Sequence, residues 1–512
     1  MTSKNNNTAS KGFVWSFLES FASQGIQFVV RVYLARLLFP EQFGLIAMLD
    51  ICMQVAQVLI ESGFGYALIQ KKDATHVDEC SVFYFNILIG FAAAGAMYLA
   101  APWIAAFYNA PMIEPLARVL SLSIIINSFG VVQVALLTKK IDFKAQAKAS
   151  IISGIISGAI GIAMAYTGFG VWSLVWHYIA LAFFRIVLYW VFCSWRPSWT
   201  FSFNSLRSMF PFASRLLLVG LLDKIYTNLF IIAIGKMYSP TLVGYYGQAD
   251  QIVSFPARNL SSPISRVVFP IFSSIKEDKI HLKKEAKKVL EASALIHFPA
   301  IIGLAAVAKP LVLALLTEKW LPSVPYIQLI CAAWILFPCQ MINFQLLTAL
   351  GRSDLFFRLD VFKKVSIAVV LIFTVPLGIM AILYGGVATS IIAYYISGYY
   401  TNKIMSYSMK EQIRDVSLVF LVSSVMGIVV FILGLVPMDN NILLFILGLV
   451  PVDNNILLLF VQVPTGVAVY IFMCRLLKLE SYHMLMSYAL EEYRKFKSYA
   501  LKEYKRMRGI NS

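Results

Sequence analysis

The stretch Val416-Ser-Leu-Val-Phe-Leu-Val-Ser-Ser-Val-Met-Gly-Ile-Val-Val-Phe-Ile-Leu-Gly-Leu-Val436 contains 21 residues and no charged side chain. About 20 apolar residues in a helix span the hydrocarbon core of a bilayer, so this stretch predicts a transmembrane helix. The chain of 512 residues has 59% hydrophobic and only 13% charged residues, with a mean hydropathy of +0.75. Ordinary soluble domains carry about 25% charged residues. The composition therefore indicates an all-α polytopic membrane protein and excludes a soluble multidomain enzyme or a secreted disulfide scaffold.

Reading outward from this stretch, about fourteen apolar runs are long enough to cross a bilayer. These runs lie near Val14–Leu38, Phe43–Ile69, Cys80–Phe107, Pro115–Thr138, Ala147–Thr167, Val171–Cys193, Phe210–Met237, Leu242–Ile275, Val289–Leu316, Pro322–Leu350, Leu359–Leu377, Ala381–Met405, Val416–Val436 and Ile456–Met473. Alternate loops are rich in Lys and Arg, whereas the intervening loops are almost bare of both. Because basic loops stay in the cytoplasm, the alternation predicts that both termini are cytoplasmic.

The basic loops also explain the net charge of +17, which arises from 43 Lys and Arg against 26 Asp and Glu. We therefore expect no nucleic-acid partner. The six cysteines and five histidines show no CxxC, HxxH or HExxH spacing. The cysteines are expected to behave as small apolar residues, and the sequence predicts neither a metal site nor a cofactor.

Similar turns recur 200 positions apart, which suggests an internal duplication. The turn Phe39-Pro40-Glu41-Gln42-Phe43-Gly44 resembles Ser239-Pro240-Thr241-Leu242-Val243-Gly244, and Asp50 matches Asp250 in the same register. Two halves with six spans each would be parallel repeats, the layout of alternating-access transporters. The predicted parts are an N-terminal six-helix bundle (1–205), a C-terminal six-helix bundle (206–408), two extra transmembrane helices (409–478) and a basic amphipathic cytoplasmic tail (479–512).

Two shorter repeats lie near the C-terminus. Residues 431–444 and 445–458 are tandem copies that differ only at Met438 and Val452, and we assign no function to the outer loop that they lengthen. In the tail, Ser487-Tyr488-Ala489-Leu490 recurs as Ser498-Tyr499-Ala500-Leu501 among many basic residues. Apolar residues at helical spacing predict an amphipathic helix on the inner membrane surface, and a solvated helical tail is the alternative.

Charged side chains inside the apolar runs are the strongest indication of function. The basic residues predicted at membrane depth are Arg31, Arg118, Arg185, Arg215, Lys224, Arg258 and Arg266. Each costs about 2.5–3.5 kcal/mol at the centre of a transmembrane helix, so some of them must face a hydrated interior. Arg118 and Arg185 are expected closer to helix ends, where long basic side chains snorkel to the interface.

Polar residues in three spans follow steps of three or four, which places each set on one helix face. The sets are Ser16, Ser20, Gln24, Gln27 and Arg31; Asp50, Gln54, Gln57 and Glu61; and Asp250, Ser254, Arg258, Ser261 and Ser265. We predict that they line a central cavity, and hydrogen bonding between helices is the alternative. Hydrogen bonding explains the Ser and Gln residues but explains the charged ones poorly. In the seventh span, Arg215 is favoured over Lys224, because the two lie on opposite faces of a straight helix.

A cavity lined by arginines attracts an anion, and the planar guanidinium matches the geometry of phosphate. A polyprenyl-pyrophosphate sugar fits such a site, with its head group in the cavity and its tail in lipid. The predicted substrate-binding residues are Arg31, Arg215, Arg258, Arg266, Lys224, Gln24, Gln27, Gln54 and Gln57. The predicted counter-ions or groups that couple transport to H+ or Na+ are Glu19, Asp50, Glu61, Asp223 and Asp250. Aromatic residues such as Trp176, Tyr245 and Tyr246 are candidates either for stacking on sugar rings or for ordinary packing.

Several short motifs resemble those of one family of membrane proteins. They are Phe43-Gly44-Leu45, Gly63-Phe64-Gly65 leading to Ile69-Gln70-Lys71-Lys72, Arg266-Val267-Val268-Phe269-Pro270 and Glu318-Lys319-Trp320. With the repeat plan, they resemble Wzx-type polysaccharide flippases of the multidrug/oligosaccharidyl-lipid/polysaccharide exporter superfamily, above all the colanic-acid and teichuronic-acid type exporters. The likeness covers nearly the whole chain and is weakest after Val416. Thr317 stands where the family pattern has Gly, and the duplication of 431–458 is foreign to the family.

The resemblance implies a protein of the bacterial inner membrane that moves undecaprenyl-pyrophosphate-linked repeat units from the inner to the outer leaflet. These units would serve exopolysaccharide or lipopolysaccharide assembly. Two bundles would rock around a cationic cavity, and Arg31 occupies a place similar to that of a pyrophosphate-contacting Arg in lipid II flippases. The expected partners are the lipid-linked oligosaccharide, membrane lipids, a polysaccharide polymerase and a chain-length regulator.

Other functions fit the sequence less well. A drug/cation antiporter of the same fold is the alternative, but acids should dominate its cavity, whereas this chain has at least as many arginines there. A membrane polymerase or glycosyltransferase needs a sizeable loop with catalytic Asp, Glu or His, so we expect no enzymatic activity. A passive scaffold explains neither the polar stripes nor the repeat.

Overall fold

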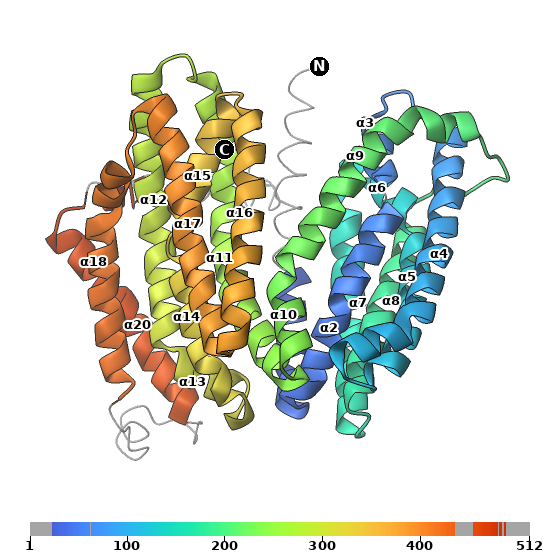
Figure 1. Cartoon of the computed structure of the whole chain (residues 1–512), viewed down its shortest axis with the longest axis horizontal. Helices are drawn as coiled ribbons and strands as arrows, with labels where there is room; N and C mark the ends of the chain where they lie inside the picture. Colours follow the sequence, from blue (N-terminus) through green and yellow to red (C-terminus); the bar gives the residue numbers. More distant parts are fainter. Residues whose placement is uncertain (1–22, 62, 436–453, 480, 484–485, 488–512) are drawn as a thin grey trace, which may run out of the picture. The chain divides into compact units, whose positions relative to one another are not determined.

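The computed structural model describes residues 23–61, 63–435, 454–479, 481–483 and 486–487, and the side chains of 260–267, 353 and 454 lie outside this description. Within these ranges every regular element is a helix (Figure 1). In this described part of the chain, eleven helical segments are long and apolar enough to cross a membrane. The chain is thus an all-helical, multi-pass membrane protein.

The chain forms two compact units. Unit 1 comprises Met1–Gly247 and Leu315–Trp320, and unit 2 comprises Gln248–Ala314 and Leu321–Ser512. The short segment Leu315–Trp320 lies between parts of unit 2 in the sequence but packs in unit 1. The predicted boundaries at residues 205, 408 and 478 rest on the sequence repeat and stay predictions.

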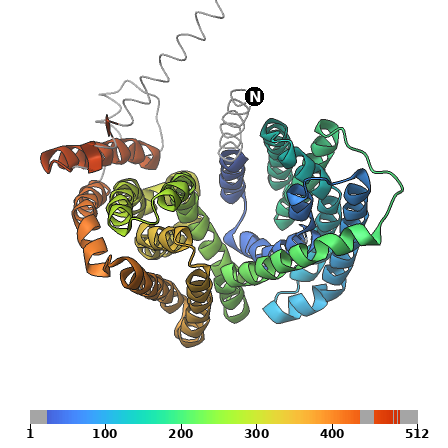
Figure 2. The ribbon, with the colours of Figure 1, turned by 90° about the horizontal axis from the view of Figure 1, so that it is seen from above.

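Unit 1 is a bundle that begins with helical residues 23–37. Its further helices are α2 (Pro40–Glu61), α3 (Phe64–Gln70), α4 (His76–Tyr108), α5 (Ile113–Ser128), α6 (Val131–Lys139), α7 (Phe143–Tyr166), α8 (Val171–Phe192), α9 (Phe203–Thr227), α10 (Leu229–Met237) and the first turns of α11 (Pro240–Ser274). α2 packs against α4, α5, α8 and α9, and α9 crosses α2, α3 and α4 obliquely (Figure 2). α2 therefore has a central place in the unit, and it carries one of the predicted polar stripes.

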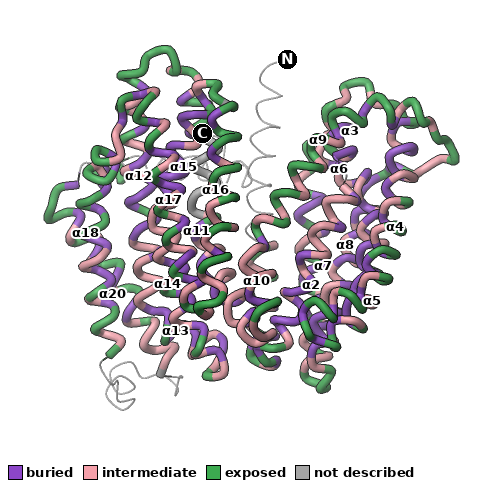
Figure 3. Tube along the Cα trace, in the orientation of Figure 1, coloured by how far each residue is buried: buried purple, intermediate pink, exposed green. Residues whose placement is uncertain are grey.

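Unit 2 holds the remaining helices. They are most of α11, then α12 (Lys279–Ala306), α13 (Ala308–Leu315, whose last residue belongs to unit 1), the end of η1 (Glu318–Ser323, which begins in unit 1), α14 (Val324–Trp334), α15 (Phe337–Ala349), α16 (Ser353–Thr374), η2 (Val375–Leu377), α17 (Ile379–Met405), α18 (Met409–Leu433) and α20 (Asn454–Leu476). α17 packs against α14, α15 and α16, while α18 packs against α12 and α20. The buried residues lie on the faces that these helices turn toward one another (Figure 3).

Several predicted spans are interrupted, although the sequence favoured continuous helices. The interruptions separate α2 from α3, α5 from α6, α9 from α10, α12 from α13 and α14 from α15. Between α2 and α3, Gly63 has a φ of 71°, a left-handed conformation that favours glycine. A Cβ at this position would lie 2.5 Å from the carbonyl oxygen of Ala213, so α9 approaches the break closely.

The predicted total of fourteen spans stays a prediction. Residues 23–37, α11 and α16 are helical but are not among the eleven segments that are long and apolar enough to span. The tandem copies around 431–458 and the tail after 479 lie largely outside the described residues.

The two similar Pro-x-x-x-Gly turns meet each other inside unit 1. A Cβ on Gly44 would lie 1.7 Å from the carbonyl oxygen of Pro240, and a Cβ on Gly244 would lie 2.0 Å from that of Pro40. Only glycine at both positions permits this reciprocal backbone contact. The contact gives both glycines a structural role, whereas the predicted six-helix repeat itself stays a prediction.

Candidate functional site

The polar stripe of α2 is present as predicted, and two of its amides pair with its carboxylates. Gln54 donates from Nε2 to Oδ2 of Asp50 over 2.7 Å, and Gln57 donates from Nε2 to Oε1 of Glu61 over 3.0 Å. Both pairs are four residues apart, which is the spacing of neighbours on one helix face. Asp50 is half-buried, so the protein shields its carboxylate from solvent in part.

Two cations lie near this carboxylate. Arg31, from helical residues 23–37, and Lys224, from α9, are both within electrostatic range of Asp50. The guanidinium carbon of Arg31 also lies 5.7 Å from the ring centroid of Phe43, in a cation–π contact. Three helices of unit 1 thus bring two positive charges and one negative charge together, and we call Arg31, Asp50, Gln54, Lys224 and Asn228 the charged cluster.

Asn228 connects the break between α9 and α10 to the charged cluster. Its side chain is 5% exposed and donates from Nδ2 to the carbonyl oxygen of Lys224 over 2.8 Å. The same group lies 3.4 Å from Oε1 of Gln54. The amide therefore satisfies a carbonyl that the end of α9 leaves without a helical partner, and it holds Gln54 beside Asp50.

Sequence reasoning missed Asn228 and Tyr178. Asn228 lies four residues after Lys224, so the same step of four that revealed the other stripes would have found it. Tyr178 of α8 lies within electrostatic range of both Asp50 and Arg31. No spacing signals Tyr178, because α8 is apolar and aromatic around it.

The other predicted binding residues are spread over both units. Gln24 and Gln27 are exposed on helical residues 23–37, and Arg215 and Asp223 are exposed on α9. In unit 2, Arg258 is exposed and Asp250 is half-buried, both on α11. Glu19 and the side chain of Arg266 lie outside the described residues. Within unit 1, Gln54 donates to Asp50, and Arg31 and Lys224 lie within electrostatic range of the same carboxylate.

The aromatic candidates for sugar stacking pack within unit 1. Tyr246 stacks on Phe230 with ring centroids 6.0 Å apart, and the Tyr245 hydroxyl donates to the carbonyl oxygen of Lys319 over 3.2 Å. Trp176 borders an apolar cavity of about 370 Å³ between α5, α7 and α8. The contacts of Tyr245 and Tyr246 favour the packing alternative for these two residues, whereas Trp176 is exposed and keeps both alternatives.

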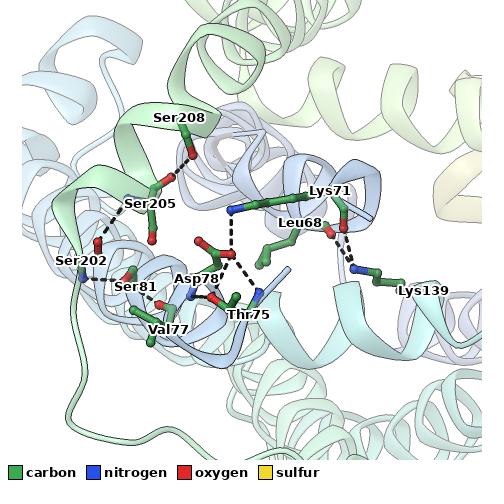
Figure 4. A network of polar contacts seen from close by, with 10 residues as sticks. All are labelled: Leu68, Lys71, Thr75, Val77, Asp78, Ser81, Lys139, Ser202, Ser205 and Ser208. Atoms are coloured by element: carbon green, nitrogen blue, oxygen red, sulfur yellow. Dashed lines mark hydrogen bonds and ion pairs between the residues drawn. The ribbon is translucent and has the colours of Figure 1, made fainter. Parts of the chain in front are cut away.

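A second polar network joins the ends of α3, α4, α6 and α9 (Figure 4). Nζ of Lys71 lies 2.7 Å from Oδ2 of Asp78, and Thr75 caps the first turn of α4 through the backbone amide of Asp78. Nζ of Lys139 donates to the carbonyl oxygens of Leu68 and Lys71 over 3.4 and 2.7 Å. Through Leu68 and Lys71, the run that begins at Gly63 and ends at Lys71-Lys72 takes part in this network. The network therefore indicates a structural role for the end of this run.

The cysteines and possible metal ligands add no further site to the described residues. All six cysteines are free thiols. Among the residues that the structure describes, no three His, Cys, Asp or Glu side chains are grouped so that they could hold a metal ion.

Known proteins resemble this chain in sequence. The family described as polysaccharide biosynthesis protein matches residues 33–325. The teichuronic acid biosynthesis protein TuaB of Bacillus subtilis (strain 168) is 27% identical over 424 residues, covering 82% of this chain and 88% of that protein. The lipopolysaccharide biosynthesis protein WzxC of Escherichia coli (strain K12) is 27% identical over 360 residues, covering 69% of this chain and 72% of that protein.

Two solved structures share the fold. The lipid II flippase MurJ in an inward closed conformation has a TM-score of 0.73 at 15% identity, covering 93% of this chain and all of that one. An inward-facing multidrug resistance MATE family transporter of the MOP superfamily has a TM-score of 0.60 at 13% identity, covering 76% and 94%. At these identities the likeness concerns the fold alone.

Proposed function

We propose a function from one premise: the chain belongs to the polysaccharide biosynthesis protein family. It is a flippase that translocates a lipid-linked oligosaccharide across the membrane. Relatives named for teichuronic acid and lipopolysaccharide biosynthesis support this proposal, and so does a fold shared with a lipid II flippase. The substrate is an undecaprenyl-pyrophosphate-linked repeat unit that moves from the inner to the outer leaflet of the bacterial inner membrane.

The charged cluster is the observation that carries the proposal. A diphosphate bears several negative charges close together, and Arg31 and Lys224 supply positive charge on two different helices of one unit. The guanidinium of Arg31 is planar and offers paired donors to phosphate oxygens, whereas Lys224 acts as a point charge. Arg215, Arg258 and Arg266 would add positive charge around a cationic central cavity that opens alternately to each leaflet.

Asp50 is the counter-ion of the empty site in this proposal. Burial of unpaired cations is costly, so Arg31 and Lys224 need a negative partner when no substrate is bound. An incoming diphosphate competes with Asp50 for the same two cations. This competition limits the affinity for the substrate and permits its release. Protonation of Asp50, or Na+ binding beside it, is then the proposed link to an ion gradient, with Glu61 as the second carboxylate of the stripe.

A drug/cation antiporter of the same fold is the competing proposal. The half-buried carboxylate of Asp50 favours it, because such a group attracts cationic drugs. The two cations beside Asp50 oppose it, since they repel a cationic drug from the same position. The flippase is therefore the preferred function, and we expect no chemical step on the substrate.

A leaflet-resolved assay tests the proposal. In cells that lack the chain but keep the glycosyltransferases, lipid-linked repeat units should accumulate on the inner leaflet. Wild-type protein should restore labelling of these units from the outer face, whereas Arg31→Ala should not. Normal labelling of these units from the outer face in cells without the protein would contradict the flippase. If the wild-type protein, without the rest of the assembly system, made cells resistant to cationic drugs, the antiporter would be favoured.

A further inference from the structure

The segment Leu315–Trp320 forms a strap that lies in unit 1, although Ala314 before it and Leu321 after it belong to unit 2. Thr317, in the middle of the strap, has a φ of 90°, which is a strained conformation for a β-branched residue. The strap ends in the motif Glu318-Lys319-Trp320, which the charged cluster leaves unexplained. Strain at an ordered segment suggests that its other contacts hold it in place.

The strap caps the end of the first described helix. Nε1 of Trp320 donates to the carbonyl oxygen of Ala35 over 2.9 Å, and Nζ of Lys319 donates to that of Arg36 over 2.7 Å. In return, Nε of Arg36 donates to the carbonyl oxygen of Leu315 over 2.8 Å. The last carbonyls of a helix have no partner within it, so the strap supplies donors where the helix needs them. This helix is the one that carries Arg31.

The indole of Trp320 also reaches the aromatic partner of Arg31. Trp320 is fully buried, and its ring meets that of Phe43 edge to face, with centroids 5.4 Å apart and an interplanar angle of 78°. Phe43 is the ring over which the Arg31 guanidinium lies. Tyr245 packs against Trp320 in the same edge-to-face manner, with centroids 6.1 Å apart. Phe43 is thus in contact with the strap and with Arg31 at once.

The backbone at Phe43 has little freedom to move. The next residue, Gly44, makes the close contact with the Pro240 carbonyl described above, and Phe43 itself is only 7% exposed. Close-packed interiors transmit the position of one ring to the next because they leave few voids. A change at Trp320 therefore alters the ring against which the guanidinium is oriented.

We propose that Trp320 is a positioning residue for Arg31, acting through Phe43. The inference rests on the proposed function, because it holds that the strap orients the guanidinium of Arg31 toward a diphosphate. The competing explanation is that Trp320 only stabilises the helix end through its hydrogen bond to Ala35. The two explanations differ in what they require of the indole: positioning needs the aromatic edge, and capping needs the N–H.

The experiment measures the affinity of purified full-length protein in lipid nanodiscs for undecaprenyl pyrophosphate. Trp320→Leu removes the edge and the N–H, and it should weaken binding about tenfold. Trp320→Phe keeps an aromatic edge but loses the N–H, and it should stay within about threefold of wild type. Lys319→Met is the matched control in the strap, since Lys319 contacts Phe39 rather than Phe43, and it should bind as wild type does.

A second background separates positioning from general damage. In Arg31→Lys the positive charge remains but the planar guanidinium is gone, so the orientation of the side chain matters less. Adding Trp320→Leu to this variant should therefore lower the affinity for undecaprenyl pyrophosphate less than about threefold. If Trp320→Leu does not fold, Phe43→Leu replaces it, because that change keeps all three hydrogen bonds between the strap and the helix and removes the ring of Phe43. Equal losses in the wild-type and Arg31→Lys backgrounds, or equal losses for Trp320→Phe and Trp320→Leu, would overturn the inference.

The same measurements separate the proposed function from the positioning role of Trp320. If Arg31→Ala binds undecaprenyl pyrophosphate as tightly as wild type, the proposed site is wrong whatever Trp320 does. If Arg31→Ala binds weakly while Trp320→Leu and Phe43→Leu bind normally, the proposed function stands and the positioning role is lost.

Discussion

The polar clusters inside the two units differ in kind. In unit 1, the charged cluster gathers Arg31 and Lys224 around Asp50. In unit 2, Asn343 and Gln412 form a neutral amide pair. Nδ2 of Asn343 donates to Oε1 of Gln412 over 3.2 Å, and Nε2 of Gln412 donates to Oδ1 of Asn343 over 3.0 Å. Asn343 is fully buried and Gln412 nearly so, and Ser397 lies 3.4 Å from Nδ2 of Asn343.

The difference separates packing from function. A neutral pair in which both amides are satisfied holds α15 and α18 together and offers nothing to a ligand. A cluster in which two cations lie near one carboxylate offers positive charge to an anion, and charged groups at membrane depth are costly unless they serve such a role. The contrast supports the charged cluster as the recognition site of the proposed flippase, and the variants below are chosen to break or sharpen it.

Removing the guanidinium of Arg31 should have the largest effect. Arg31→Ala should lower polymer export by about a hundredfold at normal protein level, because a desolvated charge contact to phosphate is lost. Arg118→Ala is the matched control, since Arg118 already pairs with Glu114 over 2.8 Å and lies over Tyr98. Export assays with immunoblots check both variants. Wild-type export by Arg31→Ala would remove the cationic site.

Keeping the charge at position 31 without the planar guanidinium should lower polymer export less than Arg31→Ala does. Arg31→Lys should retain roughly a tenth of wild-type export, because an ammonium attracts phosphate but cannot bind it through two parallel hydrogen bonds. The same export assay measures it. Full activity would show that the planar geometry of Arg31 is not used.

Neutralising Asp50 should shift affinity in the opposite direction. Asp50→Asn removes the competitor for Arg31 and Lys224, so undecaprenyl pyrophosphate should bind about three- to tenfold more tightly while export slows. Binding to purified protein and export are measured on the same variant. Asp354→Asn serves as a control, because this exposed carboxylate pairs with Arg352 outside the cluster. Weaker binding by Asp50→Asn would instead identify Asp50 as a ligand of the substrate or its coupling ion.

The neutral pair of unit 2 should affect stability and leave binding unchanged. Asn343→Leu strands the Gln412 amide and should lower the free energy of unfolding by about 1–3 kcal/mol, whereas changing both residues to Leu should recover part of the loss. Unfolding of the purified protein and binding of undecaprenyl pyrophosphate are the two measurements. A large loss of affinity in the double variant would mean that unit 2 also shapes the binding site through this pair.

Deleting residues 445–458 should have the smallest effect. The preceding copy, 431–444, ends in the same Asp-Asn-Asn-Ile-Leu-Leu sequence, so it restores the residues at the start of α20. Export should remain at the wild-type level in the assay used for Arg31→Ala. Loss of export with normal protein level would give the duplicated segment a function.

The sequence predicted those features that one helix determines by itself. Apolar runs located the helices, and steps of four placed Gln54 beside Asp50, as the 2.7 Å hydrogen bond confirms. Contacts between distant segments were out of reach, because periodicity describes one helix at a time. The contact of Asn228 with Gln54 and the approach of Tyr178 to Asp50 depend on how the helices pack. The break at Gly63 depends on the backbone of α9 in the same way.

The strap has a consequence for how the protein is made. Ribosomes deliver the helix of residues 23–37 to the membrane long before Lys319 and Trp320 are synthesised, yet these two residues donate to the carbonyls of Arg36 and Ala35. The end of this helix therefore gains these two hydrogen bonds only after translation has passed the midpoint of the chain and reached Trp320. A fragment that stops before Leu315 lacks these donors, so such fragments should be substrates for membrane proteases rather than independent domains.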